Sequence, residues 1–267
     1  MQIGISTASL FGRYYTEDAV KKLNQLNVEA TEIFLESYSE YSKKFGKKLK
    51  KMKGDLSVHS IHTLTTQFEP QLYSLNDRAR AESFDLLRGT VSAGKEVGAK
   101  YYTFHGVARI KRTPLTIDFD RVGRITQQIV DVCSAYKMGL AYENVHWAYY
   151  NYIGFFTELK KRVPELKGTL DIKQARQSGI DYKDFLNEMG GDIVTVHLSD
   201  IDKNGKMCLP GKGITDFDEL FCRLSDYNFN GALIIEVYKN DFEEIDELLQ
   251  SYNFIRDKAK KYLTNKN

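Results

Sequence analysis

Short apolar segments alternate with longer amphipathic segments along the chain. Eight of the short segments have the length and composition of strands: Gln2–Ser6, Ala30–Leu35, Leu56–His59, Tyr101–His105, Gly139–Glu143, Gly168–Ile172, Ile193–Leu198 and Ala232–Val237. The run from Ile193 to Val196 is continuously apolar or β-branched, which is typical of a strand buried on both faces of a parallel sheet.

The amphipathic segments between these strands predict helices. Asn76 is placed to cap a helix that runs to about Val97, where Gly98 provides a stop. Thr16 begins another helix, with acidic residues in its first turn. The last helix carries apolar residues at helical spacing: Phe242, Ile245, Leu248, Leu249 and Ile255. Strands alternating with helices form right-handed βαβ units, and eight units predict an α/β fold closed as a (β/α)8 barrel, with an open doubly wound sheet as the alternative.

The composition fits one barrel domain that spans residues 1–267. Hydrophobic residues make up 42% of the chain, which is enough for a large core, and no low-complexity linker divides it. The 38 basic and 36 acidic residues give a formal net charge of +2. Overall charge therefore gives no reason to expect a nucleic-acid partner.

Neither a membrane span nor a disulfide framework is expected. No apolar segment approaches the roughly 20 residues that cross a bilayer, and the first residues lack the basic and apolar regions of a signal peptide. The three cysteines are an odd number without CxxC spacing, which argues against disulfides and against a cysteine-based zinc site. We therefore expect a cytoplasmic protein.

All five histidines fall at or just after a predicted strand end: His59, His62, His105, His146 and His197. The carboxyl ends of barrel strands share one face, which is where the active sites of such barrels lie. Residues that are far apart in the sequence would converge there. The histidines therefore mark this face as the candidate site.

Three carboxylates occupy further strand ends, namely Glu143, Asp171 and Glu236. Burying them beside apolar strands is costly unless they are paired or bound to a metal, because crowded carboxylates repel one another. We predict that they form one divalent-metal site together with His197. Mn²⁺, Mg²⁺, Co²⁺ and Zn²⁺ all suit this ligand set, and a network of ion pairs that caps the barrel is the alternative.

These residues carry a resemblance to a known family. Glu143-Asn144, Asp171, His197-Leu198-Ser199-Asp200, the run from Pro210 to Phe217, and Glu236 occur in the order and strand positions of the xylose isomerase-like TIM-barrel superfamily. That group includes sugar and sugar-phosphate isomerases and epimerases, inosose dehydratases and the endonuclease IV type of abasic-site nuclease. The resemblance covers nearly the whole chain.

The resemblance implies roles for the four predicted ligands. In the isomerase and epimerase branch the matching residues bind one metal, and the two glutamates, here Glu143 and Glu236, also act as acid and base on opposite faces of the sugar. This agrees with the chemistry, because a metal bound to a carbonyl and its neighbouring hydroxyl stabilises an enediolate. A carboxylate within reach can then move the proton beside the carbonyl.

The resemblance to endonuclease IV implies a second metal. His59 and His105 resemble its additional ligands on the third and fourth strands, with Glu143 as the bridging carboxylate. Its third metal needs a histidine where this chain has Gln174, and another between Ile201 and Pro210, where none occurs. This departure argues against nuclease activity, and Gln174 also replaces a histidine that many epimerases carry.

The remaining candidates are substrate contacts. We expect His62, Trp147 and Lys212 to touch the substrate, with Lys212 on a Pro-Gly loop before the last strand. His146 is expected to line the pocket or lie on the surface. The lysine-rich segment from Lys43 to Lys53 is interpreted as the solvated face of an outer helix, with Phe45, Leu49 and Met52 packing inward, in preference to a nucleic-acid surface.

The sequence thus predicts a metal-dependent isomerase or epimerase of a small sugar, polyol or sugar phosphate. An endonuclease IV-like metallohydrolase with a reduced metal cluster is the enzymatic alternative. A barrel that binds a sugar without converting it is the alternative from another class.

Overall fold

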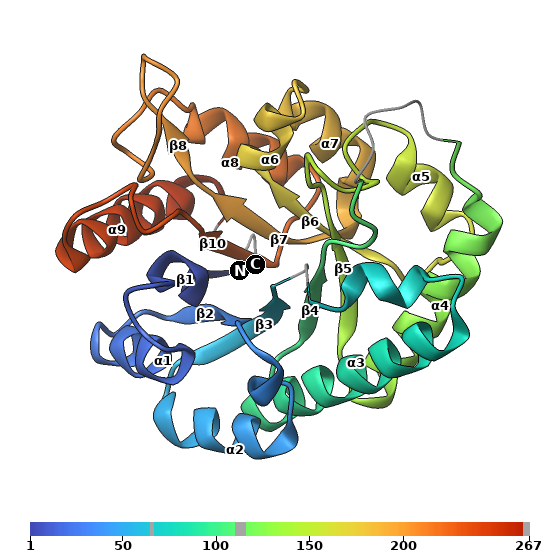
Figure 1. The fold of residues 1–267 in the computed structure, drawn as a ribbon. Helices are drawn as coiled ribbons and strands as arrows, with labels where there is room; N and C mark the ends of the chain where they lie inside the picture. The colour runs from blue at the N-terminus through green and yellow to red at the C-terminus, as the bar shows by residue number, and fades with distance from the viewer. Residues whose placement is uncertain (65–66, 110–115, 264–267) are drawn as a thin grey trace.

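The computed structural model describes residues 1–64, 67–109 and 116–263. Eight parallel strands close into a barrel in the order β1-β10-β7-β6-β5-β4-β3-β2, surrounded by helices (Figure 1). Going around the ring, the barrel strands follow one another in chain order, as a repeated βαβ unit requires. The predicted (β/α)8 barrel is therefore confirmed, and the open sheet is excluded.

The barrel strands agree closely with the predicted segments. They are β1 (Gln2–Ser6), β2 (Ala30–Leu35), β3 (Ser57–Thr63), β4 (Tyr101–Phe104), β5 (Gly139–Glu143), β6 (Lys167–Asp171), β7 (Ile193–Leu198) and β10 (Ala232–Ile235). β1, β2, β5 and β7 have the predicted bounds. Three others differ by one or two residues at an end.

The predicted end of β3 at His59 is wrong, because the strand continues to Thr63. Its polar residues find hydrogen-bond partners on other strands of the barrel. Ser60 donates a hydrogen bond to Glu32 at 2.6 Å, and His59 pairs with Thr195 at 3.0 Å. A polar strand is stable here because its buried groups find partners across the barrel.

The predicted helix start at Thr16 and the predicted helix from Asn76 to about Val97 are confirmed, but Phe242, expected within the last helix, lies before it. The helices are α1 (Thr16–Gln25), α2 (Lys43–Met52), α3 (Asp77–Val97), α4 (Phe119–Ala135), α5 (Phe155–Lys160), α6 (Ile172–Gln177), α7 (Tyr182–Met189), α8 (Phe217–Asp226) and α9 (Ile245–Leu263). The side chain of Asn76 accepts hydrogen bonds from Arg78 and Ala79 at the start of α3, and Gly98 ends it in the left-handed conformation at φ 81°. Both predicted caps are confirmed.

The lysine-rich helix α2 packs as an outer helix of the barrel. Leu49 is buried in the core, and Phe45 and Met52 pack against it while the lysines between them face outward. This confirms the interpretation of the segment as an amphipathic outer helix. None of the described helices is long and apolar enough to cross a membrane.

A short hairpin of β8 (Asp200–Ile201) and β9 (Met207–Cys208) follows β7. Asp200 accepts hydrogen bonds from the backbone amides of Ile201, Gly211, Gly213 and Thr215 at 2.8 to 3.1 Å. One buried carboxylate therefore fixes the whole connection from β7 to α8.

Candidate metal and substrate site

The four predicted ligands meet at the carboxyl end of the barrel. Glu143 and Asp171 are the last residues of β5 and β6, His197 is the penultimate residue of β7, and Glu236 directly follows β10. One ligand atom from each lies within 4.8 Å of the others. Nδ1 of His197 is 3.3 Å from Glu143 and 3.8 Å from both Asp171 and Glu236.

The donor atoms of this group fit a divalent cation. Glu143, Asp171 and His197 are each 1% exposed. A carboxylate oxygen of Glu143, of Asp171 and of Glu236 is buried without a hydrogen-bond partner among the described residues. Unpaired buried carboxylate oxygens are costly, and coordination to a hard cation satisfies them. Burial raises the pKa of Glu143 to about 7, although His197 opposes this shift.

Glu32 of β2, which the sequence analysis did not select, orients His197. It is fully buried, accepts hydrogen bonds from Ser60 and Thr103 at 2.6 Å, and lies 3.0 Å from Nε2 of His197. Burial opposes its ionisation, but the charge on His197 holds the pKa of Glu32 well below its usual range. A carboxylate behind a histidine fixes which nitrogen faces the metal. The feature of the sequence that could have identified Glu32 is its position as the only charged residue in an otherwise largely apolar strand.

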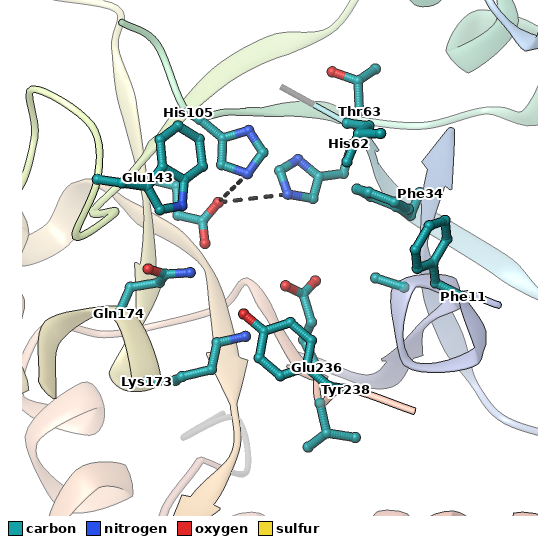
Figure 2. Close-up of a pocket in the computed structure, with 14 residues that line it drawn as sticks. Phe11, Phe34, His62, Thr63, His105, Glu143, Lys173, Gln174, Glu236 and Tyr238 are labelled. Carbon is teal, nitrogen blue, oxygen red and sulfur yellow. Dashed lines mark ion pairs between the residues drawn. The ribbon is translucent and has the colours of Figure 1, made fainter. Parts of the chain in front are cut away.

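A second group of metal-binding side chains shares Glu143. Nε2 of His62 and Nε2 of His105 lie 3.7 and 3.6 Å from Oε2 of Glu143 (Figure 2). Their other ring nitrogens are also engaged, since Nδ1 of His62 is 3.0 Å from the carbonyl of Thr103 and Nδ1 of His105 is 3.3 Å from Glu69. Both rings therefore turn Nε2 toward the same carboxylate.

His59 does not belong to this second group, contrary to the prediction. Its Nε2 contacts the hydroxyl of Thr195, two residues before His197 on β7, and is therefore deeper in the barrel. The error follows from the end of β3, because the longer strand carries His62 to the rim in place of His59. His62 and His105, with Glu143, form the group that could hold a second metal.

Glu69 is the other carboxylate that the sequence analysis missed. It is fully buried in a single 3-10 turn after β3 and accepts hydrogen bonds from Thr63, Tyr102 and the backbone of His105. Burial raises its pKa to about 7. Candidate site residues were predicted at strand ends. Glu69 lies in a turn away from any strand end, so this criterion does not identify it.

A cavity of about 300 Å³ opens above these groups. It is lined by Ala8, Phe11, Phe34, His62, Thr63, Leu64, His105, Glu143, Trp147, Lys173, Gln174, Glu236, Val237 and Tyr238 (Figure 2). The predicted contacts His62 and Trp147 are among them. Lys212 is not, because it is exposed on the loop held by Asp200. The cavity has room for a monosaccharide-sized molecule enclosed by aromatic rings.

Two residues at the start of α6 give the cavity its polar wall. Gln174 contacts Nδ1 of His146 through Oε1 at 2.6 Å. Lys173 is 2% exposed. Burial opposes its charge, but Asp171 and Glu236 hold the pKa of Lys173 above its usual value. Nothing in the sequence marks Lys173 as a cavity residue, because a lysine at the start of a helix normally points to solvent.

A closed eight-stranded parallel barrel with a carboxylate and histidine group at its carboxyl rim defines a class of protein. Residues 20–258 match the family model described as the xylose isomerase-like TIM barrel. The chain belongs to this family, in agreement with the resemblance found in the sequence.

Curated relatives include the inosose dehydratases of Bacillus thuringiensis (strain Al Hakam) and Bacillus cereus (strain 03BB102). Each is 26% identical over 140 residues, which is 50% of this chain and 42% of the relative. The match therefore spans less than half the length of these relatives.

Solved structures share the fold over nearly the whole chain. A D-tagatose 3-epimerase-like protein is 19% identical with a TM-score of 0.75, and covers 97% of this chain and 100% of its own. A D-psicose 3-epimerase determined with D-fructose is 16% identical with a TM-score of 0.78, at 99% and 100% coverage. An IolI protein with a bound zinc atom is 15% identical with a TM-score of 0.79, also at 99% and 100%.

Proposed function

We propose that this protein is a metal-dependent isomerase or epimerase of a small sugar, polyol or sugar phosphate. The observation that carries the proposal is the group of Glu143, Asp171, His197 and Glu236, which has unpaired buried carboxylate oxygens. Two of its members, Glu143 and Glu236, line a cavity of about 300 Å³. The names of the relatives, which are inosose dehydratases and sugar epimerases, support the same substrate class.

The four ligands would hold Mn²⁺, Mg²⁺, Co²⁺ or Zn²⁺, which supplies a Lewis acid for a carbonyl and its neighbouring hydroxyl. Glu143 and Glu236 come from strands separated by two others in the ring, so they approach a bound molecule from different sides. One of them takes the proton beside the carbonyl, and the other returns a proton to the opposite face or to the neighbouring carbon. His62 and His105 lie within reach of substrate hydroxyls.

The cavity wall favours a small molecule over a polymer. Phe11, Phe34 and Trp147 offer apolar faces of the kind that pack on the C–H face of a sugar ring.

The test combines metal analysis with a substrate panel. We expect about one divalent metal per chain in protein purified without chelator, and conversion of at least one ketose, aldose, inosose or sugar phosphate. Glu236→Gln should lower turnover at least 100-fold, because it removes an acid/base group. The control Glu165→Gln changes an exposed glutamate and should match the wild type. Full activity of Glu236→Gln would contradict the mechanism.

A second candidate is a metallohydrolase with two metals, favoured by the group of His62, His105 and Glu143. It predicts two metals per chain, and cleavage of an abasic-site duplex that is lost in His105→Ala. One metal per chain without cleavage at high protein concentration would remove this candidate. Thermal stabilisation by a sugar that is never converted would instead favour a sugar-binding barrel.

A further inference from the structure

Lys173 is a buried cation that faces the substrate cavity. α6 begins directly after the ligand Asp171, so its first turn holds the lysine side chain over the metal group and not in solvent. Figure 2 shows the ammonium pointing from α6 toward Glu236 and Tyr238. Nζ lies 3.9 Å from Oδ2 of Asp171 and 4.4 Å from the ring centre of Tyr238.

The ammonium has no hydrogen-bond acceptor within the described part of the chain. Its single ion pair, to Asp171, is too long for a hydrogen bond. Once Asp171 and Glu236 coordinate a cation, their negative charge no longer compensates the lysine. A buried charge without a partner is expensive. Because Lys173 lines the cavity, an oxygen of a bound molecule is placed to accept from Nζ.

The charged groups around the cavity affect how Lys173 interacts with that oxygen. Buried carboxylates around the cavity outnumber the single lysine: Glu32, Glu69, Glu143 and Asp171, with Glu236 at the rim. A divalent cation and the charged His197 would offset part of this negative charge, so Lys173 remains available to an oxygen of the bound molecule. Negative charge that develops only on an oxygen beside the metal ligands, within reach of Lys173, would be stabilised.

We propose that Lys173 is a catalytic residue that donates a hydrogen bond to the substrate oxygen that becomes negative in the enediolate; this inference rests on the proposed isomerase or epimerase function. The C–H electron pair becomes the enediolate double bond, the carbonyl π pair moves onto its oxygen, and the proton goes to a glutamate. Lys173 keeps all its protons and stabilises the oxygen through charge and hydrogen bonding.

The test uses binding as well as turnover. Lys173→Met keeps the length of the side chain without its charge, Lys173→Gln keeps an N–H donor, and Lys50→Met is the control on the exposed face of α2. All variants are loaded with metal, and full occupancy is checked by elemental analysis. The probes are glycolohydroxamate, which imitates an enediolate anion, and the neutral ketone dihydroxyacetone, both measured by calorimetry.

We expect Lys173→Met to bind glycolohydroxamate about 10- to 100-fold more weakly and dihydroxyacetone within about twofold of wild type, with kcat reduced about 100-fold. The hydroxamate affinity and kcat of Lys173→Gln should lie between those of wild type and Lys173→Met. If Lys173→Met does not fold, Lys173→Gln is compared with wild type instead. Unchanged hydroxamate binding, or equal losses for both probes, would overturn the inference. If the hydroxamate result holds but wild type converts no sugar, the proposed reaction fails and the assignment of Lys173 as an oxyanion-binding residue stands.

Discussion

Two buried carboxylates, Glu32 and Glu69, determine how histidines of the site face the cavity. Each lies behind one ring, Glu32 behind His197 and Glu69 behind His105, and contacts the nitrogen that points away from the central carboxylates. A histidine without such a partner can rotate or change tautomer, which weakens it as a ligand. The orientation of the rings is thus set by buried residues behind the predicted ligands.

Glu32→Gln is expected to weaken metal binding about 10- to 100-fold, because an amide orients His197 less strongly than a carboxylate. The measurement is a competition titration of the metal-free protein against a chelator of known affinity. Glu165→Gln, an exposed change of the same kind, serves as the control. Equal affinities of Glu32→Gln and wild type would show that Glu32 does not position the ligand.

Glu36, on the rim of the barrel, predicts a pH dependence of stability. Burial and the neighbouring carboxylates of Glu40 and Glu17 raise its pKa from 4.5 to about 7. Glu36 therefore binds a proton more tightly in the folded state than in the unfolded chain. The resulting contribution to the free energy of unfolding is fully present below pH 4.5 and is lost as the pH rises through 7. Since Glu36 is half-exposed, solvent screening reduces the effect.

Glu36→Gln should therefore raise the melting temperature at pH 8 and leave it nearly unchanged at pH 4. Thermal denaturation of the variant and of wild type at both pH values measures this. The exposed α3 change Glu82→Gln should have no pH-dependent effect. An equal shift of Glu36→Gln at both pH values would contradict the assigned cause.

At the scale of elements, the contact between α2 and α3 depends on a glycine inside a helix. A Cβ added to Gly46 would lie 2.5 Å from the carbonyl oxygen and 2.6 Å from the Cα of Ala93 on α3. Glycine is unfavourable within a helix, by about 1 kcal/mol relative to alanine. Here it allows two backbones to approach closely.

Gly46→Ala is expected to lower the free energy of unfolding by up to about 2 kcal/mol. The displacement of α2 from α3, at about 1–3 kcal/mol, exceeds the gain in helix propensity. Urea denaturation measures the difference. Lys47→Ala, at an exposed position of the same helix, should change stability by less than about 0.5 kcal/mol. A more stable Gly46→Ala protein would show that α2 can move without cost.

At the scale of the whole molecule, the candidate metal site of Glu143, Asp171, His197 and Glu236 brings together residues that are far apart in the chain. Its four residues come from β5, β6, β7 and the end of β10, which follow one another in the closed ring. A cation held by all four stabilises only the state in which these strands are assembled. Metal binding should therefore contribute to the stability of the entire barrel.

Addition of metal at about 100 times its dissociation constant should stabilise the folded protein by about 2.7 kcal/mol, and removal by chelator should reverse this. Differential scanning calorimetry with and without chelator measures the shift. Asp171→Asn, which loses one ligand charge, should show a smaller response. A melting temperature that is insensitive to metal in wild type would argue for a network of ion pairs in place of the metal site.

The sequence by itself determined the barrel and the four residues of the candidate metal site. Apolar runs at regular intervals specify strands that are buried on both faces, and the closed ring places their polar ends together, so Glu143, Asp171, His197 and Glu236 could be found without a structure. Helix caps such as Asn76 could also be predicted from the sequence, because a capping residue acts on the helix that directly follows it.

The tertiary structure alone decided which residues surround that group. Glu32 and His59 lie within strands and Glu69 in a turn, and each is paired with a residue from another strand. Lys173 is buried because α6 starts directly at the cavity rim, which no local pattern records. Hydrophobic periodicity specifies which face of an element is buried, whereas the partner of a buried polar group depends on contacts between segments that are distant in the chain.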